Sequence, residues 1–110
     1  MLVLDVEERT NANVLAVSGD LDVATAPQVR TELVRLLTDD AIRLVVDLTR
    51  VDFIDSFGLG VLVGGLKRAK TTGTDLVLVV TEPRVLKVFE VTGLDRVFDL
   101  AATVDEGLER

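Results

Sequence analysis

Residues 44–66 read LVVDLTRVDFIDSFGLGVLVGGL, and they contain the strongest indication of the fold in this sequence. It begins with a run of leucine and valine that is typical of a buried strand. From residue 56 to residue 70, apolar side chains recur on one helical face, and Gly73 ends the predicted helix. A second apolar run follows at residues 76–80. Strand, helix and strand in this order predict a parallel crossover, which puts residues 52–56 at the carboxyl end of a strand, the edge that ligands and partners favour.

The residues before this unit predict a β-hairpin followed by a helix. Residues 2–7 and 14–17 are rich in apolar, strand-forming side chains, and the turn-forming segment TNAN separates them at residues 10–13. Residues 25–28, TAPQ, are similar to a capping box with a proline in the first turn. They open a helix whose apolar positions repeat at helical spacing, and we expect it to end near Asp39.

The residues after the central unit predict two more helices and a short strand. Residues 81–84, TEPR, supply an N-cap and an early proline for a helix that ends at Gly93. Residues 97–98 form the short strand, and residues 103–106, TVDE, match a capping box for a brief last helix. The sequence therefore predicts an α/β fold in one domain, residues 1–110, with a mixed sheet of four to five strands, about four helices and an opening hairpin.

Composition excludes several classes of function. The 110 residues contain no histidine and no cysteine, which removes imidazole bases, thiol nucleophiles, Cys/His zinc sites and disulfides. A net charge of −7 at pH 7 argues against a nucleic acid partner. The longest uncharged apolar stretch is about half of the ~20 residues that a membrane span needs, and the first residues carry no signal pattern. We therefore expect a cytoplasmic protein without a cofactor, a metal, a membrane contact or direct nucleic acid binding.

Ser56 stands where the central strand passes into the helix, at an N-cap position. Serine is an ordinary N-cap residue, so capping is the simple interpretation. The free N–H groups and the positive end of the helix also favour a phosphate, so a phosphoserine is the functional interpretation. Three known motifs do not fit: a nucleophile elbow needs glycine at Ile54, a Walker A loop needs lysine at Leu66, and a dinucleotide loop needs glycine at Val63.

The helix that follows holds clustered glycines at positions 58, 60, 64 and 65. Because glycine lowers helix stability, this cluster predicts close packing of the helix on the sheet.

A second cluster consists of carboxylates that can meet at one sheet edge, namely Asp20, Asp22, Asp52 and Asp55. Such a set allows a metal site or acid–base chemistry, but aspartate is common in turns and caps, so solvated loop acids are the simpler interpretation. Phosphorylation on aspartate, as in response-regulator receivers, would require an acidic pocket after the first strand of an alternating chain, and the opening hairpin argues against that topology.

Residues 53–62, FIDSFGLGVL, resemble the signature of STAS-domain anti-sigma factor antagonists. The likeness extends to residues 19–22, GDLD, to residues 45–48, VVDL, and to residues 92–94, TGL, so it covers nearly the whole chain. The resemblance implies the STAS fold and a bacterial partner switch without enzymatic activity. The unphosphorylated protein would bind an anti-sigma factor that is also a serine kinase, which frees a sigma factor for transcription, for instance in a stress response. Phosphorylation would release it, and a metal-dependent serine phosphatase would reset it.

By position in this signature, Ser56 is the expected phosphorylation site. The residues expected to bind the partner are Asp22, Thr25, Asp55, Ser56, Phe57, Gly58 and Leu59. The family usually has a small residue after the acceptor serine, whereas this chain has Phe57. The ring could obstruct the kinase, anchor a partner or pack on the core, and we hypothesise that it is exposed and tunes partner choice.

Two alternatives to the partner switch remain at this stage. A STAS module could instead sense a small ligand near Asp22 and Ser56, or act as a scaffold in a signalling complex, without serine phosphorylation. A hydrolase would depend on Ser56 and the carboxylates alone, and it would lack a histidine to activate the serine.

Overall fold

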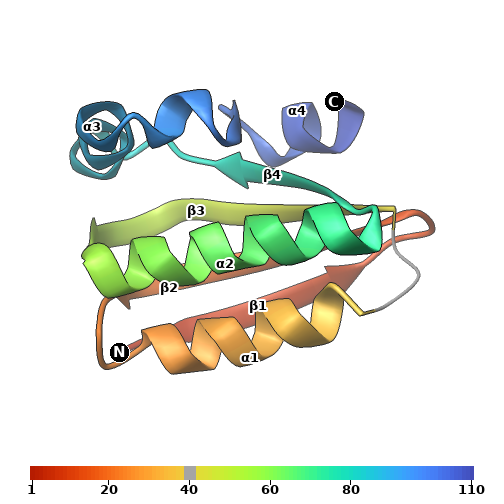
Figure 1. Cartoon of the computed structure of the whole chain (residues 1–110), viewed down its shortest axis with the longest axis horizontal. Coiled ribbons are helices and arrows are strands. Elements are labelled where there is room, and N and C mark those ends of the chain that lie inside the picture. The colour runs from red at the N-terminus through yellow and green to blue at the C-terminus, as the bar shows by residue number, and fades with distance from the viewer. Residues whose placement is uncertain (39–41) are drawn as a thin grey trace.

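The computed structural model describes residues 1–38 and 42–110, and it contains one five-stranded sheet with helices packed against it (Figure 1). In chain order the elements are β1 (Val3–Glu8), β2 (Ala12–Leu21), α1 (Ala26–Leu36), β3 (Arg43–Ile54), α2 (Ser56–Thr72), β4 (Asp75–Val79), α3 (Pro83–Thr92), the short 3-10 helix η1 (Leu94–Arg96), β5 (Asp99–Ala101) and α4 (Val104–Glu109).

The spatial order of the strands follows the chain, β1-β2-β3-β4-β5. The tight hairpin makes β1 antiparallel to β2, whereas β2, β3, β4 and β5 run parallel to one another because a helical connection separates each pair. This arrangement confirms the predicted α/β fold with a mixed sheet and an opening hairpin. It also confirms the parallel unit formed by β3, α2 and β4.

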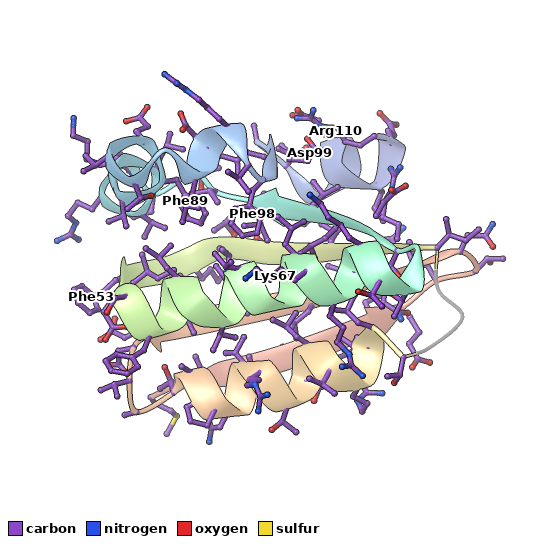
Figure 2. All side chains as sticks on the ribbon, in the orientation of Figure 1. Phe53, Lys67, Phe89, Phe98, Asp99 and Arg110 are labelled. Carbon is purple, nitrogen blue, oxygen red and sulfur yellow. The ribbon has the colours of Figure 1, made fainter. Side chains whose placement is uncertain are left out.

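The two faces of the sheet bury separate apolar clusters. Alternate side chains of β3 point to opposite faces, so Leu44 and Val46 join one cluster and Val45 joins the other. The larger cluster holds the apolar stripes of α1, α2 and α3, and it includes Phe89, whose ring meets the ring of Phe98 edge-on at 5.8 Å between centroids (Figure 2). The smaller cluster lies under α4.

Several element boundaries agree with the sequence, and others differ. Gly73 and Gly93 end α2 and α3 in left-handed backbone conformations, with φ of 74° and 76°, as expected. The strand expected at residues 97–98 is wrong, because the chain continues from η1 and the strand begins only at Asp99. Helix α1 ends at Leu36, before the expected end near Asp39, a residue that lies outside the described part of the chain.

The last helix, α4, is too short to be stable without help from the rest of the fold. Its predicted cap is confirmed, because the Thr103 hydroxyl accepts a hydrogen bond from the Glu106 N–H at 3.0 Å. At the other end, the Arg43 guanidinium of β3 donates to the carbonyl oxygens of Gly107 and Leu108 at 3.2 and 3.0 Å. Side chains from distant parts of the chain therefore hold α4 on the sheet.

Within the described residues, no helix is both long and apolar enough to span a membrane.

Candidate functional site

The candidate site lies where β2 and β3 end and the loops that follow them meet. Residues 20 and 21 pair with residues 53 and 54 in the parallel ladder, and the Asp55 N–H donates to the Leu21 carbonyl at 3.2 Å. Two register shifts in β2 and β3, between residues 16 and 18 and between residues 19 and 20, precede this point. Such irregularities change the direction of side chains at a sheet edge. Here they lie just before the motif of residues 53–62.

Asp55 connects the two loops and caps α2. Its Oδ1 accepts hydrogen bonds from the N–H groups of Phe57 and Gly58 at 2.9 and 3.0 Å, and its Oδ2 accepts from the Val23 N–H at 3.1 Å. The N-cap of α2 is therefore Asp55, and the expectation that Ser56 occupies the N-cap position is wrong. The Asp55 carboxylate is better suited to this place than the Ser56 hydroxyl, because its two oxygens accept hydrogen bonds from three backbone N–H groups.

Ser56 is the first residue of α2, and its side chain is exposed. Throughout residues 1–38 and 42–110, no group forms a hydrogen bond with its hydroxyl. The position at the positive end of a seventeen-residue helix favours a negative charge there. Ser56 thus combines an accessible hydroxyl with surroundings that tolerate a phosphate.

The loop between β2 and α1 is held by its own side chains. Asp22 Oδ1 accepts hydrogen bonds from the N–H groups of Ala24 and Thr25 at 2.9 and 3.1 Å. The Thr25 hydroxyl accepts from the Asp22 N–H at 2.9 Å and donates to the Asp20 carbonyl at 2.7 Å. Thr25 is the N-cap of α1 by position, but it makes no side-chain cap bond, so the expected capping box is not formed. The hydroxyl instead fixes the loop that faces Asp55.

Two of the expected site residues lie inside the fold. Gly58 is buried, and a Cβ there would sit 2.4 Å from the Leu21 carbonyl oxygen, so only glycine permits this approach of α2 to β2. Leu59 belongs to the main apolar cluster. The structure therefore brings Asp22, Thr25, Asp55, Ser56 and Phe57 together at the surface and places Gly58 and Leu59 beneath them.

Exposed apolar side chains lie at the end of the molecule that carries Ser56. Phe57 is 60% exposed, which confirms the expected exposure of its ring, and Phe53 and Val23 are 52% and 58% exposed. Figure 2 shows Phe53 at the end of the molecule where α2 begins. A cavity of about 460 Å³ opens beside Phe57 and Val23. Exposed clusters of this kind mark protein contact sites, because burying them in water-free contacts is favourable.

Sequence reasoning missed Phe53 and Val23 as parts of this surface. The signal for Phe53 was available, since it directly precedes the buried Ile54 and neighbouring strand residues face opposite sides. No comparable signal exists for Val23, whose exposure depends on the loop conformation that Asp22 and Asp55 impose.

The two clusters noted in the sequence have different outcomes. The carboxylates do not form a metal centre, because no group of three or more acidic side chains in the described residues could hold an ion. Close packing explains Gly58 and also Gly65, where a Cβ would lie 3.2 Å from Leu33 of α1. For Gly60 and Gly64 this explanation is wrong, since a Cβ on either would meet nothing within 4 Å.

Comparison with known proteins gives consistent matches over nearly the whole chain. The model of a family described as the STAS domain matches residues 3–107. An anti-sigma-B factor antagonist of Bacillus subtilis is 35% identical over 106 residues, which is 96% of either chain, and one of Listeria monocytogenes is 35% identical over 98 residues, 88% of this chain and 86% of the relative. The crystal structure of an anti-sigma factor antagonist from Mycobacterium paratuberculosis superposes with a TM-score of 0.91 at 29% identity, covering 99% of this chain and 92% of that one.

Proposed function

The chain belongs to the STAS domain family, and we propose that it is an anti-sigma factor antagonist, a regulator that binds an anti-sigma factor and so frees a sigma factor for transcription. A protein with this role acts by binding and not by catalysis. The observation that carries the proposal is the exposed Ser56 hydroxyl, free of hydrogen bonds within the described residues, next to the exposed ring of Phe57 in the same cavity wall.

The partner surface consists of the exposed and half-buried residues of the two loops, the end of β3 and the start of α2. Phe57, Phe53 and Val23 supply apolar area, and exposed aromatic side chains at the centre of an interface can each contribute about 2 kcal/mol or more. Asp22 and Asp55 hold the loops in shape through backbone hydrogen bonds, so this surface is preformed. Gly58 and Leu59 support it from inside. A preformed surface loses little conformational entropy when the complex forms.

Phosphorylation of Ser56 is the proposed switch. A serine kinase activity of the anti-sigma factor transfers the γ-phosphoryl group of ATP to the Ser56 oxygen, which loses its proton, and ADP is the other product. The new group carries about −1.5 to −2 charges at neutral pH, beside Asp22 and Asp55. Burying it against a partner costs desolvation and repulsion, and coupling energies of about 1–3 kcal/mol change affinity roughly 5- to 150-fold.

The folded domain tolerates this modification. The phosphate sits at the positive end of α2, and Asp55, not Ser56, makes the capping bonds. Phosphorylation therefore weakens the complex without unfolding the antagonist, and a metal-dependent serine phosphatase restores the binding form by hydrolysing the phosphoserine.

Two measurements test the proposal. Intact-mass analysis after incubation with Mg-ATP and each anti-sigma kinase of the host should show one added phosphate, absent from Ser56→Ala. The chain contains one other serine, the half-buried Ser18, so a phosphate that persists in Ser56→Ala would contradict the assignment.

Binding to the same anti-sigma factors is then measured for two variants. Ser56→Asp should bind at least about fivefold more weakly than the wild type, while Ser56→Ala should bind like the wild type. Equal affinities for both variants would refute release by charge at this position. Phe57→Ala should also lose at least about tenfold in affinity while its melting curve stays that of the wild type, because an exposed ring contributes little to the fold.

A further inference from the structure

A groove runs between α1 and α2 from Ser56 toward the carboxyl end of α2. The two helices lie side by side across one face of the sheet (Figure 1). Between them is a cavity of about 380 Å³, whose walls include Leu33 and Val34 of α1 and Gly60, Val61 and Gly64 of α2. We call this cavity the α1–α2 groove. The groove has room for several side chains of a partner, and a helix of that partner would pack over its opening.

The width of the α1–α2 groove depends on side chains that are missing from α2. Gly60 and Gly64 are exposed and one helical turn apart, and a Cβ on either would meet no atom within 4 Å. Because glycine lowers the stability of a helix interior, alanine at both positions would increase the stability of the fold. The open space above these two residues is therefore available to a partner.

The charges of the α1–α2 groove are opposite to those of the whole protein. The chain has a net charge of −7, yet α1 and α2 carry five cationic side chains and a single acidic one, Glu32. Glu32 pairs with Arg35 at 2.5 Å. Arg30 and Arg68 line the groove, and in the described part of the chain neither guanidinium lies within ion-pair distance of a carboxylate.

We propose that the α1–α2 groove binds an acidic amphipathic helix of the anti-sigma factor, an inference that rests on the proposed function. The apolar side of that helix packs over Val34 and Val61, and its carboxylates pair with Arg30 and Arg68. A second copy of this chain does not fit as the occupant, because a symmetric dimer joined through the groove would place Arg30 and Arg68 of one copy against the same cations of the other.

The position of Ser56 links the groove to regulation. Ser56 and Arg30 line the same cavity, so a phosphate on Ser56 places two negative charges at one end of the groove. These charges oppose the carboxylates of the bound helix and compete for the Arg30 guanidinium. Phosphorylation then acts on an acidic occupant along the groove as well as on the loops next to Ser56.

The test measures the affinity of the full-length protein for the anti-sigma factor that it binds. Gly64→Leu fills the groove, and Thr71→Leu is its control because it puts the same side chain on an exposed residue of α2 that does not line the groove. Arg68→Glu reverses a groove charge, and Lys67→Glu makes the same charge change on the neighbouring residue, which is exposed and does not line the groove (Figure 2). Melting temperatures are recorded for every variant.

We expect Gly64→Leu and Arg68→Glu to bind at least about tenfold more weakly, while both controls stay within about threefold of the wild type. Gly64→Leu should melt at or above the wild-type temperature. Hydrogen exchange on the anti-sigma factor should protect an acidic helical segment, and this protection should be lost with Arg68→Glu. Wild-type affinity in both groove variants, or protection of a basic segment alone, would overturn the inference and leave the proposed function standing. If the wild type binds no anti-sigma factor, both fail.

Discussion

Replacing Asp55 by alanine separates the observed cap of α2 from the alternative in which Ser56 caps it. The carboxylate receives three backbone hydrogen bonds, two from the first turn of α2 and one from Val23 in the opposite loop. Asp55→Ala removes all three at once. Ser56→Ala removes a hydroxyl that bonds to none of the described residues, and the change is otherwise compatible with a helix.

The expected magnitude follows from these contacts. Loss of an aspartate N-cap costs about 0.5–2 kcal/mol, and loss of a further hydrogen bond costs about 0.5–1.5 kcal/mol. Because the loops are partly open to water, which replaces some of the lost bonds, we expect Asp55→Ala to lower the free energy of unfolding by about 2 kcal/mol. Ser56→Ala should change it by less than about 0.5 kcal/mol, as for an ordinary surface substitution.

Urea-induced unfolding followed by circular dichroism measures both changes, with Asp55→Asn as the matched control. Asparagine caps helices about as well as aspartate, so Asp55→Asn should recover the capping part of the loss but not the bond from Val23, which its amide nitrogen cannot accept. In thermal unfolding, 2 kcal/mol corresponds to a shift of roughly 8 °C or more in a domain of this size. If Ser56→Ala is as destabilising as Asp55→Ala, or if Asp55→Ala is neutral, the assignment of the cap is wrong.

Three further stability predictions can be checked in the same urea titration. Gly58→Ala should destabilise by about 1–3 kcal/mol, because the new Cβ would lie 2.4 Å from the Leu21 carbonyl oxygen, a backbone atom that cannot move aside freely. Gly60→Ala should instead stabilise by about 0.5–1 kcal/mol, and a loss of stability there would show that the helix needs this glycine. Phe89→Ala should cost about 3–5 kcal/mol, since it empties a fully buried site and removes the edge-on contact with Phe98; a cost below about 1 kcal/mol would contradict this packing.

Much of the fold could be predicted from the sequence because its signals are local. Buried parallel strands require continuous apolar runs, and residues 44–46 and 76–80 provide them. Glycine at a helix end adopts the left-handed conformation more readily than other residues, which explains why Gly73 and Gly93 mark the ends of α2 and α3 correctly. The expected strand at residues 97–98 failed because three preceding residues form a 3-10 helix, a short element without a periodic pattern.

The place of the candidate site could be predicted from the sequence, but the contacts within the site could not. The motif around Asp55 and Ser56 identifies the loop, and the crossover rule places it at the carboxyl edge of the sheet. The two hydrogen bonds by which Asp55 caps α2 come from nearby residues, whereas the bond that joins Asp55 to the opposite loop comes from Val23, which is 32 positions away in the chain. No pattern in the residues around Asp55 predicts its hydrogen bond with Val23.

The order of strands and helices, the parallel crossover and the position of Ser56 at the start of a helix can all be predicted from the amino-acid sequence. These features depend on apolar periodicity and on the backbone preferences of single residues, both of which act over a few neighbours. Three other features arise only when distant segments come together: Asp55 joins the start of α2 to the opposite loop, Phe53 and Phe57 are left exposed, and α1 and α2 enclose a groove lined by Arg30 and Arg68. Each of these depends on which distant segments pack together, because exposure and hydrogen bonding are properties of the assembled chain.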